Sequence, residues 1–149
     1  MTIRNGSNSS DPVNIDVVTA VPGVYTQSAN GKGLVTAVNQ DRSINSATNP
    51  APKGSYVTIY AVGLGTVTPS LAVGQVPPSS PLSTTTAAVS ASVDGVAAPV
   101  SFAGAAPGFT GLYQVNLQIP AGAGSGLRAI TLYAAGGVPS QNDITIWVR

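Results

Sequence analysis

Apolar and polar residues alternate along most of this chain. The period-2 pattern covers residues 13–17, 56–62, 89–93, 113–119 and 144–148. Alternation of this kind places one face of a strand in a hydrophobic core and the other face in water. No segment shows the 3.6-residue period of an amphipathic helix. The chain is therefore predicted to be all-β and to fold as antiparallel sheets.

Turn residues separate the predicted strands. Gly occurs 17 times and Pro 12 times, and Asp94-Gly95 between two alternating stretches is a strong signal for a tight β-hairpin. About seven strands, spaced by such turns, fall within residues 34–149. This spacing predicts an immunoglobulin-like antiparallel β-sandwich.

Residues 2–18 resemble residues 131–148. Each stretch holds a short alternating strand, a turn rich in small and polar residues, and a second alternating strand. In the later stretch, Ile130 and Leu132 are expected to face residues 144–148 across the hairpin. The repeat suggests a modular array, with an extra N-terminal β-hairpin that is the end of a preceding module. The alternative is that any two short hairpins look alike.

The N-terminal hairpin, residues 1–18, carries an apolar stripe of four side chains: Ile3, Val13, Ile15 and Val17. An isolated two-stranded hairpin is only marginally stable in water. We therefore expect the stripe to be buried, either against this chain's own sandwich or in self-association that forms a homo-oligomer. In a modular parent chain, neighbouring modules would be its partners.

Two irregular stretches interrupt the strand pattern. Residues 19–33 are expected to be a connector between the hairpin and the sandwich. Residues 64–87 are rich in Pro, Ser and Thr. They are expected to form the most mobile loop of the sandwich, because little in them can pack.

Three stretches carry a family resemblance. Residues 54–65, Gly-Ser-Tyr-Val-Thr-Ile-Tyr-Ala-Val-Gly-Leu-Gly, resemble the opening strand of transcription-factor-type immunoglobulin (IPT/TIG-like) domains. Residues 37–51 and the run Ala-Pro-Gly-Phe-Thr-Gly-Leu-Tyr that opens residues 106–120 are similar to the repeated C-terminal domain of secreted acidobacterial (Solibacter-type) proteins. The resemblance covers residues 19–149. It implies an Ig-like fold and an exported setting, and it implies no catalytic residues.

A low content of charge sets the character of the surface. Charged residues make up 7% of the 149 residues and the net charge is +1, so solubility must come from Ser, Thr, Asn, Gln and Gly. The scattered cations form no basic patch for nucleic acid. No apolar run approaches the ~20 residues needed to span a membrane. The absence of Cys fits any compartment, whereas low charge with many Ser, Thr and Gly residues favours a secreted or cell-surface bacterial protein.

The chain contains no His, no Cys and no Glu. Acid–base and nucleophilic catalysis near neutral pH usually depends on these residue types. The five Asp residues mostly occupy turn contexts, where Asp is common in any case. We predict a non-catalytic structural, adhesive or interaction module that needs no cofactor. A metal-dependent hydrolase is the remote alternative.

Side-chain oxygens recur at alternate positions in Asp41, Ser43 and Asn45, as they do in calcium-binding loops. The stretch lacks the Gly at position six and the bidentate Glu at position twelve of such a loop. An ordinary turn with satisfied hydrogen bonds is therefore the expected structure. Weak calcium binding stays open as an alternative.

Aromatic side chains supply the other candidate site. Tyr133 and Trp147 have the parity to share the outer surface of the last hairpin, and Tyr56 and Tyr60 form a similar pair on an earlier strand. Aromatic platforms bind sugars by stacking and also anchor protein interfaces. A carbohydrate-binding module, with calcium assistance as an option, is thus the alternative function. Tyr and Trp are also strong strand formers, which explains their presence without any ligand.

Overall fold

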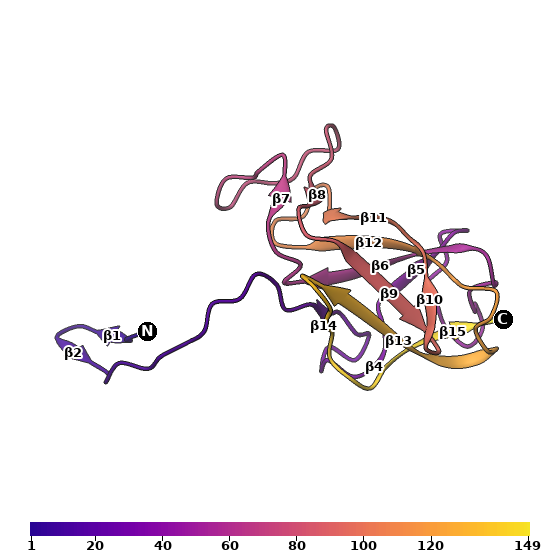
Figure 1. Ribbon diagram of the computed structural model, residues 1–149, viewed down its shortest axis with the longest axis horizontal. Coiled ribbons are helices and arrows are strands. Elements are labelled where there is room, and N and C mark those ends of the chain that lie inside the picture. The colour runs from indigo at the N-terminus through magenta and orange to yellow at the C-terminus, as the bar shows by residue number, and fades with distance from the viewer.

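The computed structural model describes residues 1–149 and is built from strands alone (Figure 1). It has a seven-stranded sheet, a six-stranded sheet and a separate two-stranded hairpin at the N-terminus. The all-β prediction is confirmed, and the two large sheets are consistent with a β-sandwich. The structure contains no helix that is long and apolar enough to cross a membrane.

The six-stranded sheet holds the strands that close the chain. Its order is β10 (Val96–Ala98), β9 (Val89–Val93), β13 (Gly126–Ala134), β15 (Ile144–Val148) and β4 (Gly33–Leu34), with β14 (Val138–Pro139) beside β13. All these pairs are antiparallel except β15 with β4, which is parallel. The last strand of the chain is therefore an interior strand, flanked on both sides.

The seven-stranded sheet forms the other layer. Its order is β3 (Gly23–Val24), β6 (Tyr56–Val62), β12 (Tyr113–Gln118), β11 (Val100–Ala105), β8 (Thr84–Thr85) and β7 (Val67–Thr68), with β5 (Ala37–Asn39) beside β6. The longest unbroken register joins β6 and β12, where Tyr113 to Gln118 pair with Ala61 to Tyr56. These two strands form the middle of the layer.

A single core cluster draws on both sheets, because the alternation of each strand points its apolar side chains the same way. Ile59 and Leu117 contribute from the seven-stranded sheet, and Leu132 and Ile146 from the six-stranded sheet. Burial of each such side chain stabilises the fold by about 1.5–3 kcal/mol. Apolar packing in this core thus holds the two layers together.

The predicted hairpin at Asp94-Gly95 is present between β9 and β10. Both turn residues have positive φ, 56° and 75°, as a tight turn between twisted strands requires. Asp94 Oδ2 also accepts a hydrogen bond from the Gly124 N–H at 3.0 Å and lies 3.8 Å from Arg128 Nη1. The turn is therefore fastened to the start of β13.

The last hairpin differs from the prediction. On one edge of β13, β15 pairs with residues 126–129, and on the opposite edge β9 pairs with residues 130–134. The far end of β13 pairs instead with the short β14. Ser140 fixes this arrangement, because its backbone N–H donates to Leu132 O and its Oγ accepts from Leu132 N–H. Residues 140–143 then continue along the same edge of β13 to β15.

The N-terminal hairpin stands apart from the sandwich. It consists of β1 (Arg4–Asn5) and β2 (Asn8–Ser9), and an extended segment joins it to the body (Figure 1). Residues 13–17 do not form a strand, because no neighbouring strand lies beside them. The stripe of Ile3, Val13, Ile15 and Val17 is exposed. Burial against this chain's own sandwich was therefore wrong, and association between copies stays a prediction.

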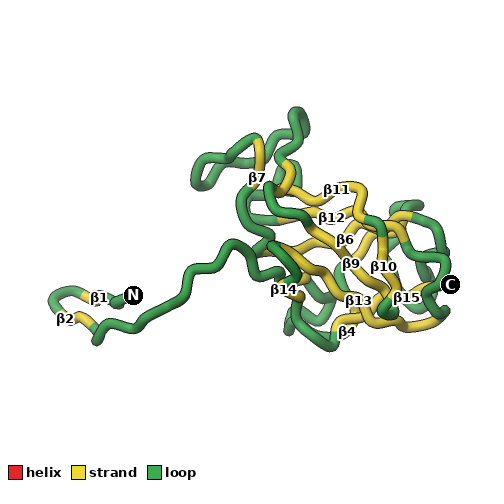
Figure 2. Tube along the Cα trace, viewed as in Figure 1, coloured by secondary structure: helices red, strands yellow, loops and turns green.

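The two irregular stretches are more structured than their sequence suggests. Residues 19–33 were expected as a connector, but they contribute β3 and β4, and Ala20 and Val24 lie in the core. The sandwich thus begins at Ala20. Residues 64–87 form a projecting arm (Figure 2), yet it contains the paired strands β7 and β8 and begins at the buried Leu64.

Candidate functional site

The residues predicted as calcium ligands do not act together. Asp41 Oδ1 accepts hydrogen bonds from Ser43 N–H at 2.9 Å and from Ser43 Oγ–H at 2.7 Å. These bonds hold the pKa of the exposed Asp41 carboxyl below its usual value of 3.8 because they favour the charged form. The carboxylate therefore serves its own turn, in which Arg42 has a φ of 70°.

Asn45 lies in the interior and bonds the last strand. Its Oδ1 accepts a hydrogen bond from Trp147 N–H at 2.9 Å, and its Nδ2 donates to Trp147 O at 2.9 Å. The side chain is fully buried. The amide group of Asn45 thus imitates the peptide group of a neighbouring strand, since it offers one acceptor and one donor to a single residue of β15.

The side-chain amide of Asn39 holds the side chain of Asn45 in place by a hydrogen bond. Asn39 Oδ1 accepts a hydrogen bond from Asn45 Nδ2 at 3.1 Å, and Asn39 Nδ2 donates to Ser43 Oγ and to Asn49 O. Both asparagines are buried, and buried polar networks of this kind are stable only when their members are satisfied. The turn of residues 39–49 is therefore held in one conformation around Asn45.

The backbone completes the attachment of β15. Ala51 N–H donates to Trp147 O, Arg149 N–H donates to Ala51 O, and Lys53 N–H donates to Arg149 O, at 2.9–3.0 Å. Val35 N–H donates to Thr145 O at 2.9 Å on the same edge of the strand. We call Asn39, Asn45 and Ala51 together the C-terminal clasp. It extends the short strand β4 along the whole of β15.

Sequence reasoning missed the clasp, although the chain carries a signal for it. Ala37 and Asn39 share the inward face of β5, so an amide occupies a position where the alternation calls for an apolar side chain. A polar residue at a core position needs a partner inside the protein. That rule would have given Asn39 a structural role, and it would have directed Asn45 to the same role instead of a calcium site.

A shallow groove lies on the outer face of the seven-stranded sheet. It has a volume of about 420 Å³ and is lined by Val38, Asn39, Gln40, Arg42, Tyr56, Thr58, Ser101 and Asn116. Asn116 Oδ1 accepts hydrogen bonds from Thr58 Oγ1 at 2.9 Å and Gln114 Nε2 at 3.0 Å. Tyr56 N–H donates to Gln40 Oε1 at 3.0 Å. One tyrosine therefore stands beside a row of amide and hydroxyl groups.

The four predicted aromatic residues do not form a common platform. Tyr56 and Tyr60 share the outer face of β6 but are four residues, or about 13 Å, apart. Trp147 and Tyr133 lie on the other sheet, where Trp147 pairs with Leu127 and Tyr133 with Pro139. Leu127 and Tyr133 are separated by six residues along β13, which is about 20 Å. Only Tyr56 adjoins a polar groove.

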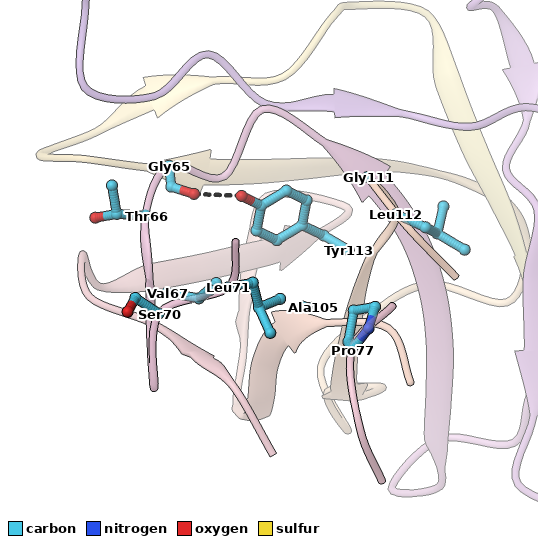
Figure 3. Close-up of a pocket in the computed structure, with 10 residues that line it drawn as sticks. All are labelled: Gly65, Thr66, Val67, Ser70, Leu71, Pro77, Ala105, Gly111, Leu112 and Tyr113. Atoms are coloured by element: carbon cyan, nitrogen blue, oxygen red, sulfur yellow. Dashed lines mark hydrogen bonds between the residues drawn. The ribbon is translucent and has the colours of Figure 1, made fainter. Parts of the chain in front are cut away.

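A small pocket lies between the 64–87 arm and strands β11 and β12 (Figure 3). Its lining is largely apolar and includes Val67, Leu71 and Leu112. Tyr113 points its hydroxyl at Gly65, where the O–H donates to the carbonyl oxygen, and burial raises the pKa of Tyr113 above 10.0. The volume of about 260 Å³ falls short of a typical ligand site. This pocket serves to tie the arm to the body.

No three Asp side chains gather into a group able to hold a metal ion. No family model, curated protein or solved structure matches the chain. The clasp and the Tyr56 groove are therefore interpreted from their geometry.

We expect Asn45→Ala to lower the free energy of unfolding by about 2–5 kcal/mol, because it leaves Trp147 N–H and Asn39 Oδ1 buried without partners. Denaturant unfolding followed by tryptophan fluorescence measures this directly. The matched control is Asn14→Ala, since Asn14 is exposed on the N-terminal segment and should change stability by less than about 0.5 kcal/mol. Equal stability of the two variants would show that the clasp contributes nothing.

Proposed function

We propose that residues 20–149 form an immunoglobulin-like (IPT/TIG-like) structural module, a spacer or interaction domain within an exported, modular bacterial protein. Three features of the sequence support this proposal: the resemblance to a repeated domain of secreted proteins, the low charge, and the scarcity of residues suited to catalysis. The structure supports the proposal by the positions at which the chain enters and leaves the sandwich.

The observation that carries the proposal is that the chain enters and leaves the sandwich at opposite ends (Figures 1 and 2). A module of this shape spaces its neighbours along a line, because a segment joined at Ala20 and a segment joined at Arg149 are held apart by the length of the body. Domains whose termini lie close together are suited to insertion instead. The geometry thus favours a serial array.

Both ends of the body are firmly fixed. Where the chain enters, Val21 N–H donates to Gly63 O at 2.9 Å, and a Cβ on Gly63 would lie 2.1 Å from Val21 O. The two backbones can meet this closely only because residue 63 is glycine. Where the chain leaves, the C-terminal clasp and β13 enclose β15. Tension on the chain therefore acts on hydrogen-bonded strands at both ends.

Single-molecule force spectroscopy tests this function on the full chain with handles at both termini. We expect one cooperative unfolding event, and we expect Asn45→Ala to lower the unfolding force because it loosens β15. Asn14→Ala, in the exposed segment, should leave the force unchanged. A chain that extends without a distinct event, or one in which the two variants behave alike, would contradict a mechanical role for the sandwich.

Carbohydrate binding is a second candidate, favoured by the Tyr56 groove. A tyrosine ring flanked by Gln40, Thr58 and Asn116 combines a stacking surface with amide and hydroxyl groups that match sugar hydroxyls. On a glycan array, Tyr56→Ala should abolish any binding that the unaltered chain shows. Tyr133→Ala is the matched control, because Tyr133 lies on the outer face of the opposite sheet. Loss of binding in the control alone, or no binding by the unaltered chain, would reject the groove as a glycan site.

A further inference from the structure

The detached N-terminal hairpin repeats a specific hydrogen-bonding pattern of the sandwich. At the end of β13, Leu132 N–H donates to Ser140 Oγ at 3.1 Å and Ser140 N–H donates to Leu132 O at 2.7 Å. At the N-terminus, Ile3 N–H donates to Ser10 Oγ at 3.0 Å and Ser10 N–H donates to Ile3 O at 2.9 Å. Ile3 thus stands where Leu132 does, and Ser10 where Ser140 does.

The correspondence continues into the following strand, with one residue fewer between Ser10 and Val13 than between Ser140 and Ile144. The register of β13 and β15, extended by one pair, sets Ile130 opposite Ile144. In the N-terminal segment, Val13 N–H donates to Met1 O at 2.9 Å and the Met1 amino group donates to Val13 O at 2.5 Å. Met1 and Val13 therefore repeat the positions of Ile130 and Ile144.

The two hairpins differ in their turns and agree in their pairing. Gly6-Ser7 joins β1 to β2, whereas Ala135, Gly136 and Gly137 join β13 to β14. A shared turn type would explain a shared register, but these turns have different lengths. The serine hydrogen-bonding pattern that both hairpins share therefore points to a common structural role. A chance likeness between short hairpins would not reproduce this pattern.

The matched positions have opposite surroundings. Four N-terminal side chains, Ile3, Val13, Ile15 and Val17, are 65%, 59%, 55% and 97% exposed. Their counterparts Leu132, Ile144, Ile146 and Val148 are 0%, 2%, 0% and 1% exposed. The N-terminal segment thus carries the pattern of a core strand without the core.

The place that β15 fills is defined by backbone groups and could accept another strand. Its neighbours on one side are the N–H groups of Val35 and Ala51 and the amide of Asn45, all bonded to main-chain atoms of β15. Side-chain identity enters only through the inward apolar positions. At the outward positions, Asn14 and Asp16 would stand where Thr145 and Trp147 face away from the core.

We propose that residues 1–18 are a donor hairpin that completes a second module of this same fold, taking the place that residues 130–149 hold here. This inference rests on the proposed modular function and names the partner that binds the N-terminal end of the module. The acceptor is a second module, because residues 130–149 already fill this module's own place beside β9 and β4. Val17 corresponds to Val148, so only Val18 and Thr19 would separate the donated strand from Ala20. Adjacent modules would then be nearly in contact.

A graft tests whether the hairpin fits. In the full chain, residues 130–149 are replaced by a copy of residues 1–18, and thermal unfolding is followed by circular dichroism. We expect cooperative melting, and we expect its loss when the grafted copy carries Ile3→Ser, Val13→Ser and Ile15→Ser. If the unaltered graft melts no more cooperatively than this control, the hairpin is not a module end. Force curves of the native chain do not depend on this result, so the proposed function can stand or fall separately.

A truncated chain tests donation between molecules. A chain that ends at Ala129 has a vacant acceptor and a free donor, so we expect linear oligomers by light scattering and a cooperative melt. With Ile15→Asp, the same truncated chain should stay unfolded and unassociated. Identical behaviour of the two truncated chains would overturn the proposal.

Discussion

The sandwich depends on how its last strand is held. β15 is an interior strand, but β4 is only two residues long, so most of one edge of β15 would lack a partner if strands alone supplied it. Unpaired backbone groups in the interior cost about 1–3 kcal/mol each. Asn45 and Ala51 supply the missing partners, and they bring Ile144, Ile146 and Val148 into the core. The apolar packing between the two layers follows from this closure.

The same closure explains why the two ends of the chain are so unlike. Residues 144–148 and residues 13–17 have similar alternation, yet one stretch is buried and the other is exposed. Alternation makes a strand possible, and a strand forms only where a neighbour offers a row of hydrogen-bonding groups. The clasp and β13 offer that row to β15. Nothing within this chain offers it to the N-terminal segment, which is why we propose a second module as its partner.

Much of the fold could be predicted from local patterns. The alternation of residues 56–62 and the Asp94-Gly95 turn each act over a few residues, and both predictions are confirmed. The pairing of β15 with residues 126–129 could not be read in this way, because it depends on Ser140, which bonds Leu132 and so sets where the returning chain meets the edge of β13. Among the site residues, Asp41, Ser43 and Asn45 were recognised as a group of oxygens. Asp41 and Ser43 belong to an exposed turn, whereas the Asn45 amide is buried because it bonds Trp147, which is remote in sequence.

Hydrogen exchange at the Trp147 amide tests this account most directly, because that N–H donates to Asn45 Oδ1. If the clasp closes the sandwich, the Trp147 amide should exchange as slowly as the Val115 amide in the middle of the other sheet, through global unfolding. Exchange of Trp147 at the rate of a fraying chain end, with Val115 still protected, would contradict it. The core would then be complete without its last strand.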